Sequence, residues 1–97
     1  MYMEQDIVEH LIRTADTVAI REMEYRNAKL ELEVLKAQYI MQNDWEKIIG
    51  KNRPTVQEKE AYIKIQLEER ERRVNELKVK RDYCRRIFEI NMNAQLY

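Results

Sequence analysis

Few side chains in this sequence combine in a way that supports catalysis or metal binding. His10 is the single histidine and Cys84 the single cysteine. A lone histidine neither completes a zinc site within one chain nor relays a proton to a second imidazole. Arginines near Cys84 favour its thiolate, but an apolar helix position is more typical of a buried cysteine than of a reactive one. We therefore expect no metal, no cofactor and no disulfide within the chain.

The acidic side chains do not point to an enzyme either. Carboxylates recur in close pairs, such as Glu22 with Glu24. On amphipathic helices such carboxylates are ordinarily solvated and form ion pairs with cations three or four residues away. General acid–base catalysis needs a cleft that excludes water, and a thin pair of helices offers none. We therefore expect a protein that is not an enzyme.

A basic stretch in the last third of the chain is the strongest candidate for a charged binding surface. Between residues 70 and 86 there are eight basic and three acidic side chains. Basic helices can follow a phosphate backbone, so nucleic acid or an acidic protein is a candidate partner. The alternative is that these cations pair with an acidic first helix and with solvent. The residues assigned to this candidate face are Arg72, Arg73, Lys80, Arg85 and Arg86.

The balance of residue types favours long helices. Charged residues make up 37% of the chain and hydrophobic residues 44%, with one glycine and one proline in 97 residues. Such a composition, with apolar residues at helical spacing, is typical of long helices and coiled coils. The 18 basic and 18 acidic side chains cancel. The net charge therefore gives no overall attraction to nucleic acid or to anionic lipid.

Targeting signals and membrane spans are not recognisable in the sequence. Residues 1–6 lack the apolar core of a secretory signal. No stretch approaches the roughly 18 apolar residues that a membrane-spanning helix needs. Together with the single cysteine, these features predict a cytoplasmic protein in a reducing compartment, with no membrane partner.

The only glycine and the only proline lie together in the segment 50–55. Gly50 can adopt the left-handed backbone that ends a helix, and Pro54 cannot continue one. Thr55 and Glu58 then have the form of a capping box. In that motif the hydroxyl accepts from the Glu58 N–H, and the carboxylate reaches back to the Thr55 N–H. One helix is therefore expected to end, and another to begin, within this segment.

No strong helix breaker occurs on either side of that segment, which predicts an all-α fold with one domain over residues 1–97. The fold class is an antiparallel two-helix hairpin of coiled-coil type. Its expected elements are a helix over 6–49, a turn over 50–55 and a helix over 56–93. A weaker capping signal at Asn43-Asp44-Trp45-Glu46 leaves open a break near Asn43 and a short helix over 44–49.

The first helix carries two apolar rows on roughly opposite sides. We expect one of them to face the second helix, because its spacing is mostly three and four residues. Its members are Val8, Ile12, Ala15, Ala19, Met23, Leu30, Val34, Ala37, Met41, Trp45 and Ile48, with Asn27 in the remaining position. The other row comprises Leu11, Val18, Tyr25, Ala28, Leu32, Leu35 and Tyr39.

The second helix carries one main apolar row. Its members are Ile63, Leu67, Val74, Leu77, Cys84 and Phe88. Folding about residue 52 places residue i of the first helix near residue 104 − i of the second, within one turn. This register brings Arg81 beside Glu22 and Glu24, and Arg70 beside Glu31 or Glu33. The first third of the chain has excess acid and the last third excess base, which favours this antiparallel pairing.

A helix in a lone hairpin needs only one apolar face, so the other row predicts self-association. We expect a homodimer that forms a four-helix bundle, or a larger oligomer. The residues assigned to the interface between copies are Leu11, Val18, Tyr25, Ala28, Leu32, Leu35, Tyr39, Ile87 and Ile90.

The segment from Trp45 to Gln66 contains the sequence Gly50-Lys51-Asn52-Arg53-Pro54-Thr55-Val56-Gln57-Glu58-Lys59-Glu60-Ala61-Tyr62. It covers about a quarter of the chain and resembles the turn-and-helix segment of small helical accessory proteins encoded by bacteriophages and prophages. The resemblance implies an accessory factor that acts by binding a host or viral protein. It assigns no functional residue.

These observations predict an oligomeric helical module for protein–protein interaction, and the resemblance adds an inhibitor or adaptor of a host protein. Two alternatives stay open. One is an accessory protein that binds nucleic acid through the basic stretch of the second helix. The other is a structural scaffold or assembly protein.

Overall fold

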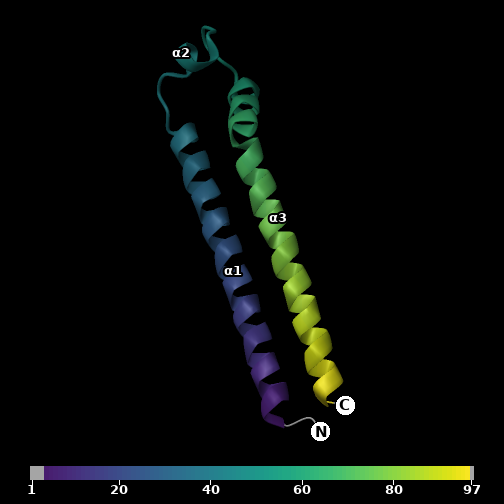
Figure 1. The fold of residues 1–97 in the computed structure, drawn as a ribbon. Coiled ribbons are helices and arrows are strands. Elements are labelled where there is room, and N and C mark those ends of the chain that lie inside the picture. The colour runs from purple at the N-terminus through teal and green to yellow at the C-terminus, as the bar shows by residue number, and fades with distance from the viewer. Residues whose placement is uncertain (1–3, 97) are drawn as a thin grey trace.

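The chain forms a hairpin of two long helices. The computed structural model describes residues 4–96, with side chains for residues 5–94, and contains α1 (Glu4–Ile40), α2 (Trp45–Ile49) and α3 (Val56–Leu96). Figure 1 shows α1 and α3 side by side and antiparallel, with α2 at the loop end and both chain ends at the other. The hairpin is a rod of 75 × 16 × 15 Å. The prediction of an all-α helical hairpin is confirmed.

None of the helices within residues 4–96 combines the length and the apolar character that crossing a bilayer requires.

The turn is built largely as its sequence predicts. Gly50 has a left-handed backbone with φ of 77°, and its N–H donates to the backbone carbonyl oxygen of Glu46 at 2.8 Å. The Glu58 N–H donates to Thr55 Oγ1 at 3.1 Å, as expected for the capping box. The return bond differs from the expectation, because Glu58 Oε1 accepts from the Thr55 hydroxyl at 3.2 Å and from Lys51 Nζ at 2.8 Å. These bonds fix the start of α3.

The predicted helix over 6–49 is not continuous. α1 begins at Glu4, two residues before the expected start, and ends at Ile40. The short helix α2 follows, so the alternative break near Asn43 is the one that occurs. α3 extends three residues beyond the predicted end at residue 93.

The burial of Trp45 explains the break. If α1 continued as one helix, Glu46 would lie seven residues after Tyr39 and would face α3 as Tyr39 does. Trp45 would then lie beside the contact. Instead Trp45 keeps only 7% of its surface exposed, while Glu46 is exposed. The Trp45 ring meets Tyr62 edge-on at 5.9 Å between centroids, and Tyr62 meets Tyr39 at 6.1 Å. The three rings close the loop end of the hairpin.

α1 packs on α3 through the row that was assigned to contacts between copies. Leu32 forms a buried cluster with Leu67 and Val74 of α3. Partly buried residues pack against this cluster: Tyr25, Ala28, Leu35, Tyr39 and Ile63. The row expected to face α3, from Val8 to Met41, lies outside. The assignment of the two faces of α1 was therefore wrong, and the two rows exchange roles.

The period of the rows gives the physical reason. The row of α3 recurs in strict steps of four and three residues from Ile63 to Phe88, when Arg70 and Arg81 are counted in it. The inner row of α1 does the same from Leu11 to Tyr39, when polar Thr14 and Arg21 are counted in it. Two seven-residue periods can supercoil around each other and stay in contact. The other row contains consecutive four-residue steps, so it drifts off that supercoil.

The row and register predicted for the second helix are confirmed. Leu67, Val74 and Leu77 are buried, and the remaining members, Ile63, Cys84 and Phe88, are half-buried. Cross-helix pairs join Glu22 to Arg81 and Lys36 to Glu71. Both pairs agree with the predicted register within one helical turn. The register fixes only the relative position along the two helix axes, so the wrong choice of face on α1 does not affect it.

Candidate interaction surfaces

The nine residues assigned to contacts between copies divide into two groups. Seven belong to the inner row of α1, where α3 of the same chain covers the central part and Leu11 and Val18 continue it half-buried. That part of the interface prediction is wrong, because α3 already occupies the face. Ile87 and Ile90 of α3 remain 36% and 55% exposed.

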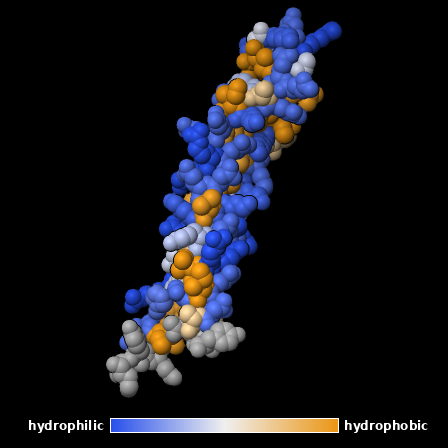
Figure 2. All heavy atoms as spheres, turned by 90° about the vertical axis from the view of Figure 1, so that its right-hand side faces the viewer, coloured by the Kyte–Doolittle hydropathy of each residue, from blue (hydrophilic) through white to orange (hydrophobic). Residues whose placement is uncertain are grey.

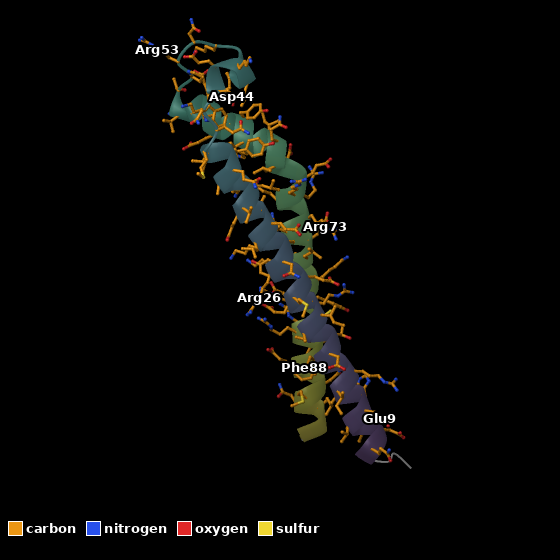
Figure 3. All side chains as sticks on the ribbon, turned by 90° about the vertical axis from the view of Figure 1, so that its left-hand side faces the viewer. Glu9, Arg26, Asp44, Arg53, Arg73 and Phe88 are labelled. Atoms are coloured by element: carbon orange, nitrogen blue, oxygen red, sulfur yellow. The ribbon has the colours of Figure 1, made fainter. Side chains whose placement is uncertain are left out.

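The outer row of α1 is a long apolar feature that no other part of the described chain covers. Its larger side chains are between 48% and 78% exposed: Val8, Ile12, Met23, Leu30, Val34 and Met41. Ala15, Ala19 and Ala37 are exposed between them. Figure 3 looks onto α1 and shows Arg26 projecting from the surface of this helix. An exposed apolar row of this kind is a candidate interaction surface.

The sizes of the side chains in the two rows also indicate which row faces α3, and the prediction did not use them. The row contains three alanines, whereas the inner row offers Leu32, Leu35 and two tyrosines. The larger side chains bury more area against α3. Period and side-chain size together identify which row faces inward.

A cluster of charges clamps the middle of the hairpin around Glu22. Its Oε2 accepts from Arg85 Nη2 of α3 at 2.9 Å and lies 3.5 Å from Arg81 Nε, and its Oε1 accepts from Arg26 Nε at 2.9 Å. The predicted pairing of Arg81 with Glu22 is confirmed. Partial burial alone would raise the pKa of Glu22, but the Arg26 hydrogen bond and the three cations outweigh it, so the pKa lies below its usual value.

Arg81 is the one half-buried cation of the α3 row, and it is well satisfied. Its guanidinium donates twice to Asp82 Oδ1, at 2.9 and 3.0 Å, and lies 4.4 Å from the centre of the Tyr25 ring. The hydrogen bond to Asp82 raises its pKa most strongly, so the charge is permanent. A paired, stacked arginine is tolerated at such a position, where an unpaired one would be costly.

The loop end carries a groove between the three helices. It has a volume of about 600 Å³ and is lined by Lys36, Ile40, Trp45, Val56, Lys59, Glu60, Ile63, Lys64 and Glu71. Lys36 Nζ pairs with Glu71 Oε1 at 3.1 Å, a contact the sequence did not single out. Figure 2 shows apolar side chains gathered at this end and recurring in patches along the α3 side.

The basic residues of α3 do not form one face. At about 100° per residue, Arg73 and Lys80 lie on one flank of the contact with α1, while Arg72 and Arg86 lie on the outer side. Arg85 lies on the other flank, paired with Glu22. Arg72 is close to Glu68, at 3.5 Å. A phosphate backbone needs cations along one side of a helix, so this distribution gives nucleic-acid binding no support.

The remaining candidates for chemistry are isolated. His10 is exposed, and Cys84 is half-buried. Within the described part of the chain, no three histidine, cysteine or carboxylate side chains come together as a metal site.

Comparison of the chain with protein-family models, with curated proteins and with solved structures gives no match.

Proposed function

We propose that this chain is a helical protein–protein interaction module that associates with itself through the outer row of α1. The exposure of that row carries the proposal. It runs from Val8 to Met41 along a helix whose opposite side already binds α3. A second hairpin placed on the row gives an assembly of four long helices.

The small core of the single hairpin supports the same proposal. Within residues 5–94, five apolar side chains are buried: Leu32, Trp45, Leu67, Val74 and Leu77. One thin core of this kind buries little apolar area, and oligomerisation is one way in which small proteins add to it. Covering the outer row would add apolar burial along the whole of α1.

The size of the row fits a stable dimer. From Val8 to Met41 it is about 50 Å long at 1.5 Å per residue. A contact band about 10 Å wide then covers on the order of 500 Å² on each copy. The pair would bury roughly 1,000 Å², the lower limit for a specific interface. We therefore expect a reversible dimer whose population depends on protein concentration.

A matched pair of variants tests the proposal. Val34→Glu places a carboxylate in the outer row, whereas Ile65→Glu places one on an exposed apolar position of α3 outside it. We expect Val34→Glu to raise the dissociation constant at least about tenfold in sedimentation experiments, because a twofold interface receives two buried charges. Ile65→Glu should leave it unchanged. Equal dissociation constants for the two variants would overturn the proposal, provided that circular dichroism shows both to be helical.

A further inference from the structure

The spacing of the outer row has a regularity of its own. From Val8 to Met41 the row advances in steps of four, three and four residues. The pattern occurs three times when Arg26, in place of Asn27, is taken as the position between Met23 and Leu30. The ten positions are Val8, Ile12, Ala15, Ala19, Met23, Arg26, Leu30, Val34, Ala37 and Met41. Eleven residues make three turns at about 3.67 residues per turn, close to the 3.6 of a straight helix. The row therefore stays nearly parallel to the axis of α1.

The order of these steps is the same from Val8 to Met41 as from Met41 to Val8. Its centre of symmetry lies between Met23 and Arg26. When two such rows run antiparallel, every member of one lies opposite a member of the other, as an interface with a twofold axis requires. The opposed pairs are Val8–Met41, Ile12–Ala37, Ala15–Val34, Ala19–Leu30 and Met23–Arg26.

We propose, resting on the self-association proposed above, that a second copy of this chain covers the outer row with its own α1, antiparallel, about a twofold axis between Met23 and Arg26. The partner is thus this chain itself, in one direction and one register. α3 of each copy lies on the outside of the pair of α1 helices.

Side-chain sizes favour this direction. Three consecutive pairs each join an alanine to a larger side chain, with Ala15 opposite Val34 as an example. Such alternation lets the two surfaces interdigitate without gaps. In a parallel pair every residue would face its own copy. Each of the three alanines would then face an alanine and leave a gap, and the larger side chains would compete for space.

The charge of Arg26 separates the two directions as well. In the parallel arrangement Arg26 would face Arg26, and opposed like charges are unfavourable. In the antiparallel arrangement it faces Met23 of the second copy. Its Nε already bonds to Glu22 of its own helix at 2.9 Å, so its charge is paired and its aliphatic stem can cover the methionine.

The register is fixed by the number of pairs. Sliding one copy by a full repeat moves it 11 residues, about 16 Å. The spacing would still match, but three of the ten positions on each copy would lose their partners. The central register is the one that covers all ten.

Cross-linking measures direction and register together. In a Cys84→Ala background, the double variant Ala19→Cys/Leu30→Cys places thiols that oppose each other only in the proposed arrangement. Within one helix the two positions are about 16 Å apart, so a short bis-maleimide cannot join them inside a chain. We expect covalent dimers from the double variant and none from either single variant. A second pair, Ala15→Cys/Val34→Cys, keeps Leu30 and tests the same register.

The outcomes separate this inference from the proposed function. Covalent dimers from the single variants would show a parallel or shifted pair, and a dimeric mass without cross-links in either double variant would show another contact face. Both results overturn the inference while self-association stands. A single-chain mass for the reduced parent throughout the micromolar range would overturn the proposed function itself.

Discussion

Leu30 and Leu32 carry the same side chain on the same helix, two residues apart, and the hairpin treats them differently. Leu32 is 7% exposed in the core with Leu67, while Leu30 is 60% exposed on the far side of α1. Hydrophobicity cannot distinguish them. Their difference lies in the period of the row to which each belongs, because only the seven-residue row keeps pace with α3.

The same contrast occurs at the loop end between two neighbours. Trp45 points inward and Glu46 outward, and the break after Ile40 makes this possible. At this end the helix is interrupted, and the interruption allows the large apolar side chain of Trp45 to be buried. Inward and outward positions are therefore set by packing against α3, and each can be tested by substitution.

The largest effect is expected at Trp45. Trp45→Ala should lower the free energy of unfolding by about 3–5 kcal/mol, because it empties the site where the ring contacts Tyr62. Glu46→Ala, its outward neighbour, should cost less than about 1 kcal/mol. Urea unfolding at one fixed protein concentration provides both values. Similar losses for the two variants would refute the account of the helix break.

The second prediction compares the two leucines directly. Leu32→Ala should lower the free energy of unfolding by about 2–5 kcal/mol at every protein concentration, since it removes part of the core within one chain. Leu30→Ala should have little effect in dilute protein. Its loss should grow with concentration, because only the associated state uses Leu30. Thermal unfolding across a concentration series checks this, and a large loss for Leu30→Ala in dilute protein would contradict it.

A smaller effect is expected at the start of α3. Thr55→Ala removes the hydroxyl that accepts from the Glu58 N–H and should cost about 1 kcal/mol. Thr55→Ser keeps the bond and serves as the control. This pair of variants tests the stability of the turn without changing the apolar rows. If unfolding shows no difference between the two variants, the capping box does not stabilise the hairpin.

The smallest effect is expected from the flank of the contact, at Glu22. Because its pKa is lowered in the folded chain, its contribution is present above the unfolded value of about 4.3 and is lost as pH falls through the folded pKa. The stability advantage of the parent over Glu22→Gln should therefore be present at neutral pH and vanish in acid. Glu9→Gln, which removes one exposed carboxylate elsewhere on α1, is the control. A stability advantage that is equal at pH 7 and in acid would argue against a stabilising role for the ion pairs of Glu22.

Local signals predicted the architecture well. Gly50 and Pro54 punctuate the chain once, and the capping pair of Thr55 and Glu58 marks where α3 begins. Such signals act over a few residues and depend little on the rest of the fold. The register followed from the position of the turn, and it correctly placed Arg81 beside Glu22.

The facing of α1 could not be read in the same way. Both of its rows are apolar and both have helical spacing, so each looked able to face α3. The choice depends on a property of two helices together, the match between their periods. The helix break was also hard to predict, because it follows from where Trp45 meets Tyr62 rather than from a strong breaker.

The most direct test of the account is the absolute mass of the parent chain in solution, measured by light scattering across micromolar concentrations. The account predicts that the mass rises with concentration from the chain mass of 11.9 kDa towards twice that value, because a second copy covers the outer row of α1. A mass of 11.9 kDa throughout that range would contradict it.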